Sequence, residues 1–230
     1  MPARNAIKQY KENGYYHIYN RGVEKRDIFI DKQDSSVFLN YLKEYLSPKD
    51  IEGLVKVIGN PKLSSGGDKA KAVRLLRMNN FVDEIELLAY CLMPNHFHLL
   101  IRQNEARSIE KFMKSLLTRY VQYFNHRYDR VGGLFQDIYK AVMVKSEEQL
   151  LWLSRYIHRN LSSKGSSLKD SPLPSSYVNY LGLVQQKWIK PQGILNYFAK
   201  SGINSYRVFV EDDLNDAKAE ELIRTVIIEG

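Results

Sequence analysis

Two apolar runs, at residues 82–92 and 96–103, are separated only by Met93-Pro94-Asn95, and this pattern constrains the fold more than any other feature of the chain. Short apolar runs bounded by turn residues are typical of β-strands. A connection this short cannot form a crossover, so it joins neighbouring antiparallel strands. The sequence therefore predicts a largely antiparallel sheet.

The segments around this hairpin alternate between strand and helix patterns. A strand is expected at residues 15–20, followed by a helix with Asp34 as its N-cap. A long helix with apolar residues at three- and four-residue steps begins at Ser108, and a strand is expected at residues 139–144. Ser146 then begins a helix with a capping box. This order predicts an α+β fold with a ferredoxin-like antiparallel sheet and helices packed on one face.

Two segments lie outside this pattern. Residues 49–80 contain Gly59-Asn60-Pro61 and a Ser/Gly cluster, which are loop signals, and we interpret them as an insertion. The last part of the chain, residues 183–230, is interpreted as a small helical C-terminal extension. Its short helical patterns lie near residues 191–200, 205–211 and 216–227.

The composition favours a polyanionic partner. The 230 residues carry a formal net charge of +8, and their 44% apolar content supports a packed core. Nucleic acid is favoured over a membrane as this partner. Cys91 is the only cysteine, which excludes an internal disulfide and a zinc site built from several thiolates. Because no signal peptide or membrane-spanning run is recognised, a cytoplasmic protein without a membrane partner is expected.

Two histidines, His96 and His98, stand two residues apart in the second predicted strand. Successive strand side chains point to opposite faces of a sheet, so the two imidazoles share one face. Neutral imidazoles are common metal ligands, and the pair forms half of a site for a divalent metal ion. Such a pair also arises by chance. The other histidines are scattered in the sequence and add no second cluster.

Tyr156 and Asn160 lie four residues apart on the capped helix, and therefore on the same helical face. Together they offer a reacting group and a further ligand. Each also has an ordinary structural interpretation, because a tyrosine beside the core packs there and an asparagine near a helix end caps it. The spacing alone does not decide between these alternatives.

Several segments, in this order, resemble the HUH single-tyrosine transposases of the insertion-sequence and REP-associated (RAYT) branch. The histidine pair with the preceding Met93-Pro94-Asn95 resembles the HUH motif of that family. The resemblance covers about residues 15–182. Its other segments are residues 16–22, 115–125, 133–136, 139–140, 155–160 and 175–182.

The resemblance implies a catalytic domain at residues 1–182 and a role for each candidate residue. His96 and His98 are implied as ligands of Mg²⁺ or Mn²⁺, with Asn160 as the third ligand. Tyr156 is implied as the nucleophile of a transposase, an HUH endonuclease that nicks and rejoins single-stranded DNA. The implied intermediate is a covalent 5′-phosphotyrosine beside a free 3′-hydroxyl.

The implied substrate is single-stranded DNA that contains a hairpin. Basic residues of the matched segments are candidates for contacts with its phosphates. A homodimer is a further possibility that the resemblance raises, and it leaves open whether the nucleophile acts within its own subunit. The candidate DNA contacts are Arg21, Arg119, Lys140 and Arg155.

Two other classes of function are considered. A non-catalytic nucleic-acid-binding regulator on the same fold would share the basic charge, but it would need neither the histidine pair nor the tyrosine. A hydrolytic metalloenzyme that activates water would be expected to carry a cluster of acidic ligands, which the sequence does not offer.

Overall fold

A four-stranded antiparallel sheet runs through the protein in the computed structural model, which describes residues 10–60, 65–160, 168, 173–198, 203–212, 221 and 223–224. The strand order is β2-β3-β1-β4, and all three pairings are antiparallel. This is the split arrangement expected from the sequence, so the α+β class and the antiparallel sheet are confirmed. The strands are β1 (Tyr15–Arg21), β2 (Ile85–Met93), β3 (His96–Gln103) and β4 (Lys140–Met143).

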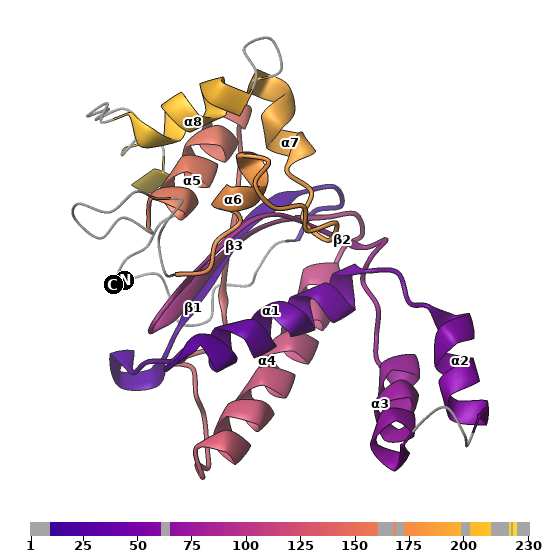
Figure 1. Ribbon diagram of the computed structural model, residues 1–230. Helices are drawn as coiled ribbons and strands as arrows, with labels where there is room; N and C mark the ends of the chain where they lie inside the picture. Colours follow the sequence, from indigo (N-terminus) through magenta and orange to yellow (C-terminus); the bar gives the residue numbers. More distant parts are fainter. Residues whose placement is uncertain are drawn as a thin grey trace.

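Two long helices, α1 (Lys32–Leu46) and α4 (Ser108–Arg127), pack on one face of this sheet (Figure 1). Every second strand residue points toward them, as the pleat requires. Phe97 of β3 is fully buried and meets Phe38 of α1, whose ring lies 5.3 Å away between centroids. Tyr120 of α4 contacts Phe38 edge-on at 5.0 Å. These aromatic contacts join the sheet and both helices in one core.

The opposite face is also covered, which the sequence prediction did not include. Helix α5 (Glu147–Arg159) lies across it, and the C-terminal segment packs against α5 on the same side (Figure 1). The sheet contributes apolar residues to this second core, and each α-helix there contributes at least one buried side chain. The C-terminal elements are α6 (Tyr177–Tyr180), α7 (Gln192–Leu195), the 3₁₀-helix η3 (Asn196–Phe198) and α8 (Ile203–Glu211).

Residues between 174 and 190, which follow α5 in the chain, also form backbone hydrogen bonds with the edge of β2. The backbone N–H of Leu92 donates to the Pro174 carbonyl, and that of Ser176 donates to the Tyr90 carbonyl. The N–H of Lys190 donates to the Leu87 carbonyl farther along the strand. Covering a sheet edge in this way removes a surface on which another chain can pair.

The insertion consists of two helices, α2 (Ile51–Gly59) and α3 (Gly66–Arg77), which project from the body (Figure 1). Each helix begins with a side-chain cap. Asp50 accepts a hydrogen bond from the Gly53 N–H, and Ser65 forms a capping box with Asp68. The loop signals in the sequence therefore mark the ends of helices here.

The N-cap of α1 is Asp31, and the sequence prediction of Asp34 was wrong. The Asp31 side chain accepts hydrogen bonds from the N–H groups of Gln33 and Asp34. Asp34 lies in the first turn with no exposed surface. Its carboxylate accepts hydrogen bonds from the Ile30 N–H, the hydroxyls of Tyr123 and Tyr128, and the Arg127 guanidinium.

The remaining boundaries deviate by a few residues. Strand β2 begins at Ile85 because residues 82–84 form a turn, and a 3₁₀-helix, η1 (Val23–Lys25), follows β1. Most of the helix expected at residues 216–227 lies outside the described residues. None of the helices in the described part of the chain combines the length and hydropathy needed to span a bilayer.

Candidate active site

The candidate site lies on the sheet face that α5 covers. His96 and His98 of β3 point to this face, opposite to Phe97, as the sequence predicted. Across the strand pair, His98 stands beside Tyr19 of β1, and His96 stands beside Arg21. The site therefore draws on two adjacent strands.

His98 is held by a second buried histidine, His17 of β1. The two rings stack with centroids 5.0 Å apart, and His17 Nε2 lies 2.9 Å from His98 Nδ1. Burial lowers the pKa of His98 well below 6.5, and the nearby charges of His17, His96 and Arg21 add to this effect. His98 is therefore neutral at pH 7, and one of its ring nitrogens carries a lone pair.

The other ring nitrogen of His98 identifies the direction in which a ligand would bind. His98 Nε2 is buried and has no hydrogen-bond partner among the described residues. Buried polar atoms are nearly always satisfied in folded proteins, so an orphaned imidazole nitrogen suits a metal ion or a substrate atom.

His96 lies beside His98 with its ring nearly perpendicular, at 5.0 Å between centroids. Its Nδ1 lies 2.6 Å from Asn95 Oδ1. An amide oxygen only accepts hydrogen bonds, so Nδ1 carries a proton and donates this hydrogen bond. Both histidines thus use Nδ1 for a protein contact, which is the arrangement seen for histidines that ligate through Nε2.

Helix α5 brings Tyr156 to these histidines. Ser146 caps the helix by accepting a hydrogen bond from the Gln149 N–H, and Leu153 and Ile157 bury its apolar face. This orientation of the helix turns Tyr156 toward the histidines. The Tyr156 ring lies edge-on to those of His98 and His17, with centroid distances of 5.6 Å and 6.5 Å. The half-buried phenol of Tyr156 thus lies on the sheet face that carries His96 and His98.

Asn160 is the C-cap of α5. Its backbone N–H and its side-chain Nδ2 both donate to the Tyr156 carbonyl, each at 3.1 Å. The capping role named as an alternative from the sequence is therefore present. No hydrogen bond joins Asn160 to either His96 or His98 in the described part of the chain, although the helix places it one turn beyond Tyr156.

Two of the four candidate DNA contacts lie at this face. Arg21 ends β1 beside His96. Lys140 begins β4 and pairs with Tyr19, and its Nζ lies 3.3 Å from Asp137 Oδ2. Arg21 thus borders His96 directly, and Lys140 is separated from His98 by Tyr19.

The structure does not bring Arg119 and Arg155 to this site. Arg119 extends from α4, on the other side of the sheet, and pairs with Glu44 at 2.6 Å. Arg155 is 9% exposed, and its Nε donates to the Phe209 carbonyl of α8 at 2.6 Å. The positive charge of Arg155 thus holds the C-terminal segment against α5.

His17 is the residue of this face that the sequence reasoning missed. It was grouped with the scattered histidines because it lies far from His98 along the chain. The available signal was strand parity, because β1 and β3 were both predicted and antiparallel neighbours place equivalent side chains on one face. The strand register was not available from the sequence.

His158 has a structural role. It has no exposed surface, and its Nδ1 lies 2.7 Å from the Tyr206 hydroxyl of α8. Its Nε2 lies 2.8 Å from Ser176 Oγ. Desolvation lowers the pKa of His158 to about 3. This neutral ring links α5 to the segments before α6 and in α8.

The burial of His158 predicts a loss of stability in mild acid. A histidine in an unfolded chain has a pKa of about 6.5, so the unfolded state binds more protons between pH 3 and that value. Stability is fully present above this window and falls as the pH is lowered through it. One such group costs about 2 kcal/mol at pH 5.

The measurement is chemical unfolding at pH 7.5 and pH 5 for the unmodified protein and for His158→Gln. The glutamine variant is expected to be less stable at pH 7.5 and to lose less on acidification. The same acid dependence in both proteins would contradict the assignment.

Comparisons with known proteins find a matching family model and a similar solved structure. Residues 65–160 match the family model described as "Transposase IS200 like". That segment contains both His96 and His98 as well as Tyr156 and Asn160. No curated protein sequence matches the chain at a significant level.

The chain is also similar to a solved REP-associated tyrosine transposase bound to a REP hairpin. The two share 12% identity with a TM-score of 0.44, over 79% of this chain and 88% of the other. Over residues 65–160, which contain both histidines and Tyr156, the chain is therefore similar to IS200-like transposases.

Proposed function

We propose that this protein nicks and rejoins single-stranded, hairpin-bearing DNA with Tyr156 as the nucleophile and a divalent metal ion as cofactor. One observation carries the proposal: the Tyr156 ring lies 5.6 Å from that of His98, a buried neutral imidazole. Its orphaned Nε2 supports a ligand at the same place.

The residues present suit a metal ion. His96 and His98 would supply imidazole nitrogens, and Asn160 would supply an amide oxygen after leaving its capping position. No group of three or more His, Cys, Asp or Glu side chains in the described part of the chain is arranged to hold a metal. Two imidazoles favour Mn²⁺ over Mg²⁺, because Mg²⁺ prefers oxygen ligands. When bound, the ion neutralises charge on the scissile phosphate.

Tyr156 would perform the covalent step. Its hydroxyl oxygen attacks the phosphorus, the bond from phosphorus to the 3′-oxygen breaks, and the phenolic proton is passed to solvent while the departing oxygen gains one. The products are a 5′-phosphotyrosine and a free 3′-hydroxyl. Attack of a 3′-hydroxyl on the phosphotyrosine reverses the step, so rejoining needs no other energy source.

Two cations at the edge of the site would hold the DNA. Arg21 pairs with His96, and Lys140 pairs with Tyr19, whose other neighbour across the sheet is His98. Their charges would attract the phosphates next to the scissile bond, and the guanidinium of Arg21 can bind a phosphate through two hydrogen bonds.

The test is covalent capture of DNA. The protein is incubated with single-stranded DNA carrying a stem-loop in Mn²⁺, and the sample is analysed on a denaturing gel. A DNA–protein band that EDTA prevents is expected, while fully duplex DNA of the same sequence should give none. Stable binding without any covalent band would favour the non-catalytic regulator.

His17 is expected to act as a positioning residue for His98. If His98 binds the metal through Nε2, its Nδ1 carries the proton and donates to His17 Nε2, 2.9 Å away. Removing such a partner typically weakens metal binding by about 10–100-fold. His17→Ala should show this loss in Mn²⁺ titrations of the DNA-free protein.

The matched variant is His17→Gln, whose side-chain oxygen can accept the same hydrogen bond. It should recover part of the Mn²⁺ affinity. A purely structural His17 would lower the thermal stability of both variants and leave their Mn²⁺ affinity unchanged, which would refute the positioning role.

A further inference from the structure

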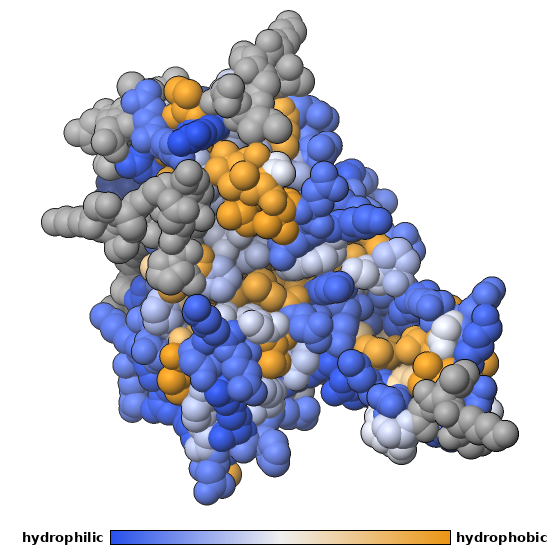
Figure 2. Space-filling model, viewed as in Figure 1, coloured by the Kyte–Doolittle hydropathy of each residue, from blue (hydrophilic) through white to orange (hydrophobic). Residues whose placement is uncertain are grey.

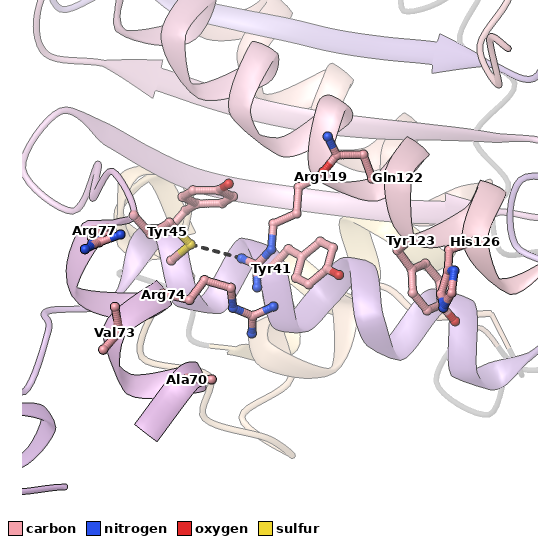
Figure 3. Close-up of a pocket in the computed structure, with 11 residues that line it drawn as sticks. Tyr41, Tyr45, Ala70, Val73, Arg74, Arg77, Arg119, Gln122, Tyr123 and His126 are labelled. Atoms are coloured by element: carbon pink, nitrogen blue, oxygen red, sulfur yellow. Dashed lines mark hydrogen bonds between the residues drawn. The ribbon is translucent and has the colours of Figure 1, made fainter. Parts of the chain in front are cut away.

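A second candidate binding surface lies on the other side of the sheet, between the insertion and the α1–α4 layer. It is a groove of about 750 Å³ lined by residues of α1, α3 and α4. The close-up shows Arg74 and Arg77 on the α3 side of the groove and Arg119 on the α4 side, with Arg77 and His126 at opposite ends (Figure 3). In the space-filling view the α2–α3 lobe stands off from the body, with a notch between them (Figure 2).

The groove is strongly cationic. Arg74 and Arg77 reach it from α3, and Arg119 reaches it from α4. Arg119 is paired with Glu44, but no ion pair of Arg74 or Arg77 exists within the described residues. None of the described residues that line the groove is acidic. The three guanidinium groups thus have only the Glu44 carboxylate as an ion-pair partner among the described residues. The excess positive charge of the groove attracts an anion.

Aromatic rings accompany these cations. The Arg119 guanidinium lies 3.7 Å above the Tyr41 ring, and Tyr123 lines the same wall. Arg119 is held by Tyr41 and Glu44. The cations of the groove that are open to a ligand are therefore Arg74 and Arg77, which are exposed. Their guanidinium groups can each pair with a phosphate of a nucleic acid.

We infer that this groove binds the sugar–phosphate backbone of DNA at a place remote from the cleavage site. The sheet separates it from Tyr156, so the bound segment would be the stem-loop or flanking strand and not the scissile phosphate. The choice of DNA as the ligand rests on the proposed function; the site itself rests on the charge and shape of the groove. The insertion would then be a clamp arm that extends the DNA contact.

The test measures binding without covalent capture. The full chain with Tyr156→Phe is titrated with fluorescein-labelled single-stranded DNA carrying one stem-loop, at several salt concentrations. Adding Arg74→Gln and Arg77→Gln should weaken binding about tenfold and reduce the slope of log affinity against log salt by about 1.5, because each lost phosphate contact removes roughly 0.7–0.9.

The control carries Lys56→Gln and Lys71→Gln on the same lobe, two exposed cations that do not line the groove. It loses the same charge and should keep the affinity and the slope. Equal effects of the two pairs, or no effect of either, would overturn the inference. The unmodified protein, assayed in parallel for covalent capture of the same DNA, tests the proposed function, so failure of the groove and failure of the proposed function give different results.

Discussion

The Tyr156→Phe variant is expected to form no covalent DNA adduct, a loss of at least about 10³-fold, because it lacks the only oxygen that can become the phosphotyrosine. The variant keeps the ring that packs edge-on against His98 and His17. Its fold and its noncovalent affinity for DNA should therefore match those of the unmodified protein. Denaturing gels measure the first property, and fluorescence anisotropy with labelled DNA measures the second.

Tyr19→Phe is the matched control. Tyr19 lies on the same sheet face, with its ring 6.0 Å from that of His98, so the change removes an equivalent hydroxyl beside the same histidine. This variant should still form the adduct. Adduct formation by Tyr156→Phe at the rate of the unmodified protein would remove Tyr156 from the mechanism.

The His98→Ala variant is expected to lose metal-dependent capture, with a fall in rate of about 10³-fold, since a metal ion at a phosphate contributes several kcal/mol to the transition state. The lost imidazole is the one whose Nε2 is buried without a partner. The measurement is the rate of adduct formation as a function of Mn²⁺ concentration.

His98 is 4% exposed, so its removal also leaves a cavity that can destabilise the fold. His96→Ala serves as the second variant, because His96 is more exposed and its loss disturbs packing less. It should fold normally and lose the same metal-dependent rate. Normal rates in His96→Ala that persist in EDTA would show that the reaction needs no ion at these histidines.

The sequence predicted the parts of the fold that depend on local patterns. Strand alternation placed His96 and His98 on one face, and the apolar spacing of α4 identified its buried side. The hairpin at Met93-Pro94-Asn95 followed from its short connection. Each of these features is determined by side chains close together in the chain.

Features that depend on distant contacts were not predictable in this way. Helix α5 covers the second face of the sheet, and Tyr206 and Val210 of α8 pack in the same core. Nothing near those residues in the chain signals that contact. Asp34 resembled an N-cap, but its burial with Arg127 depends on the packing of α1 on α4. The pairing of His17 with His98 required the strand register.

The four candidate DNA contacts also show that positions set by distant packing cannot be predicted from the sequence. Arg21 and Lys140 lie on strands, where parity and strand ends determine their position beside the histidines. Arg119 and Arg155 lie on helices whose outer faces meet other elements, so their charges face Glu44 and the carbonyls of α8. A cation on a helix can be assigned to a surface only after its neighbours are known.

The most direct test of the central claim is to map the DNA attachment site. Adduct formed in Mn²⁺ is digested with nuclease and protease, and the modified peptide is sequenced by tandem mass spectrometry. The account predicts a nucleotide on the phenolic oxygen of Tyr156 and on no other residue. Attachment at another of the tyrosines, or a cleaved strand with no attached peptide, would contradict it.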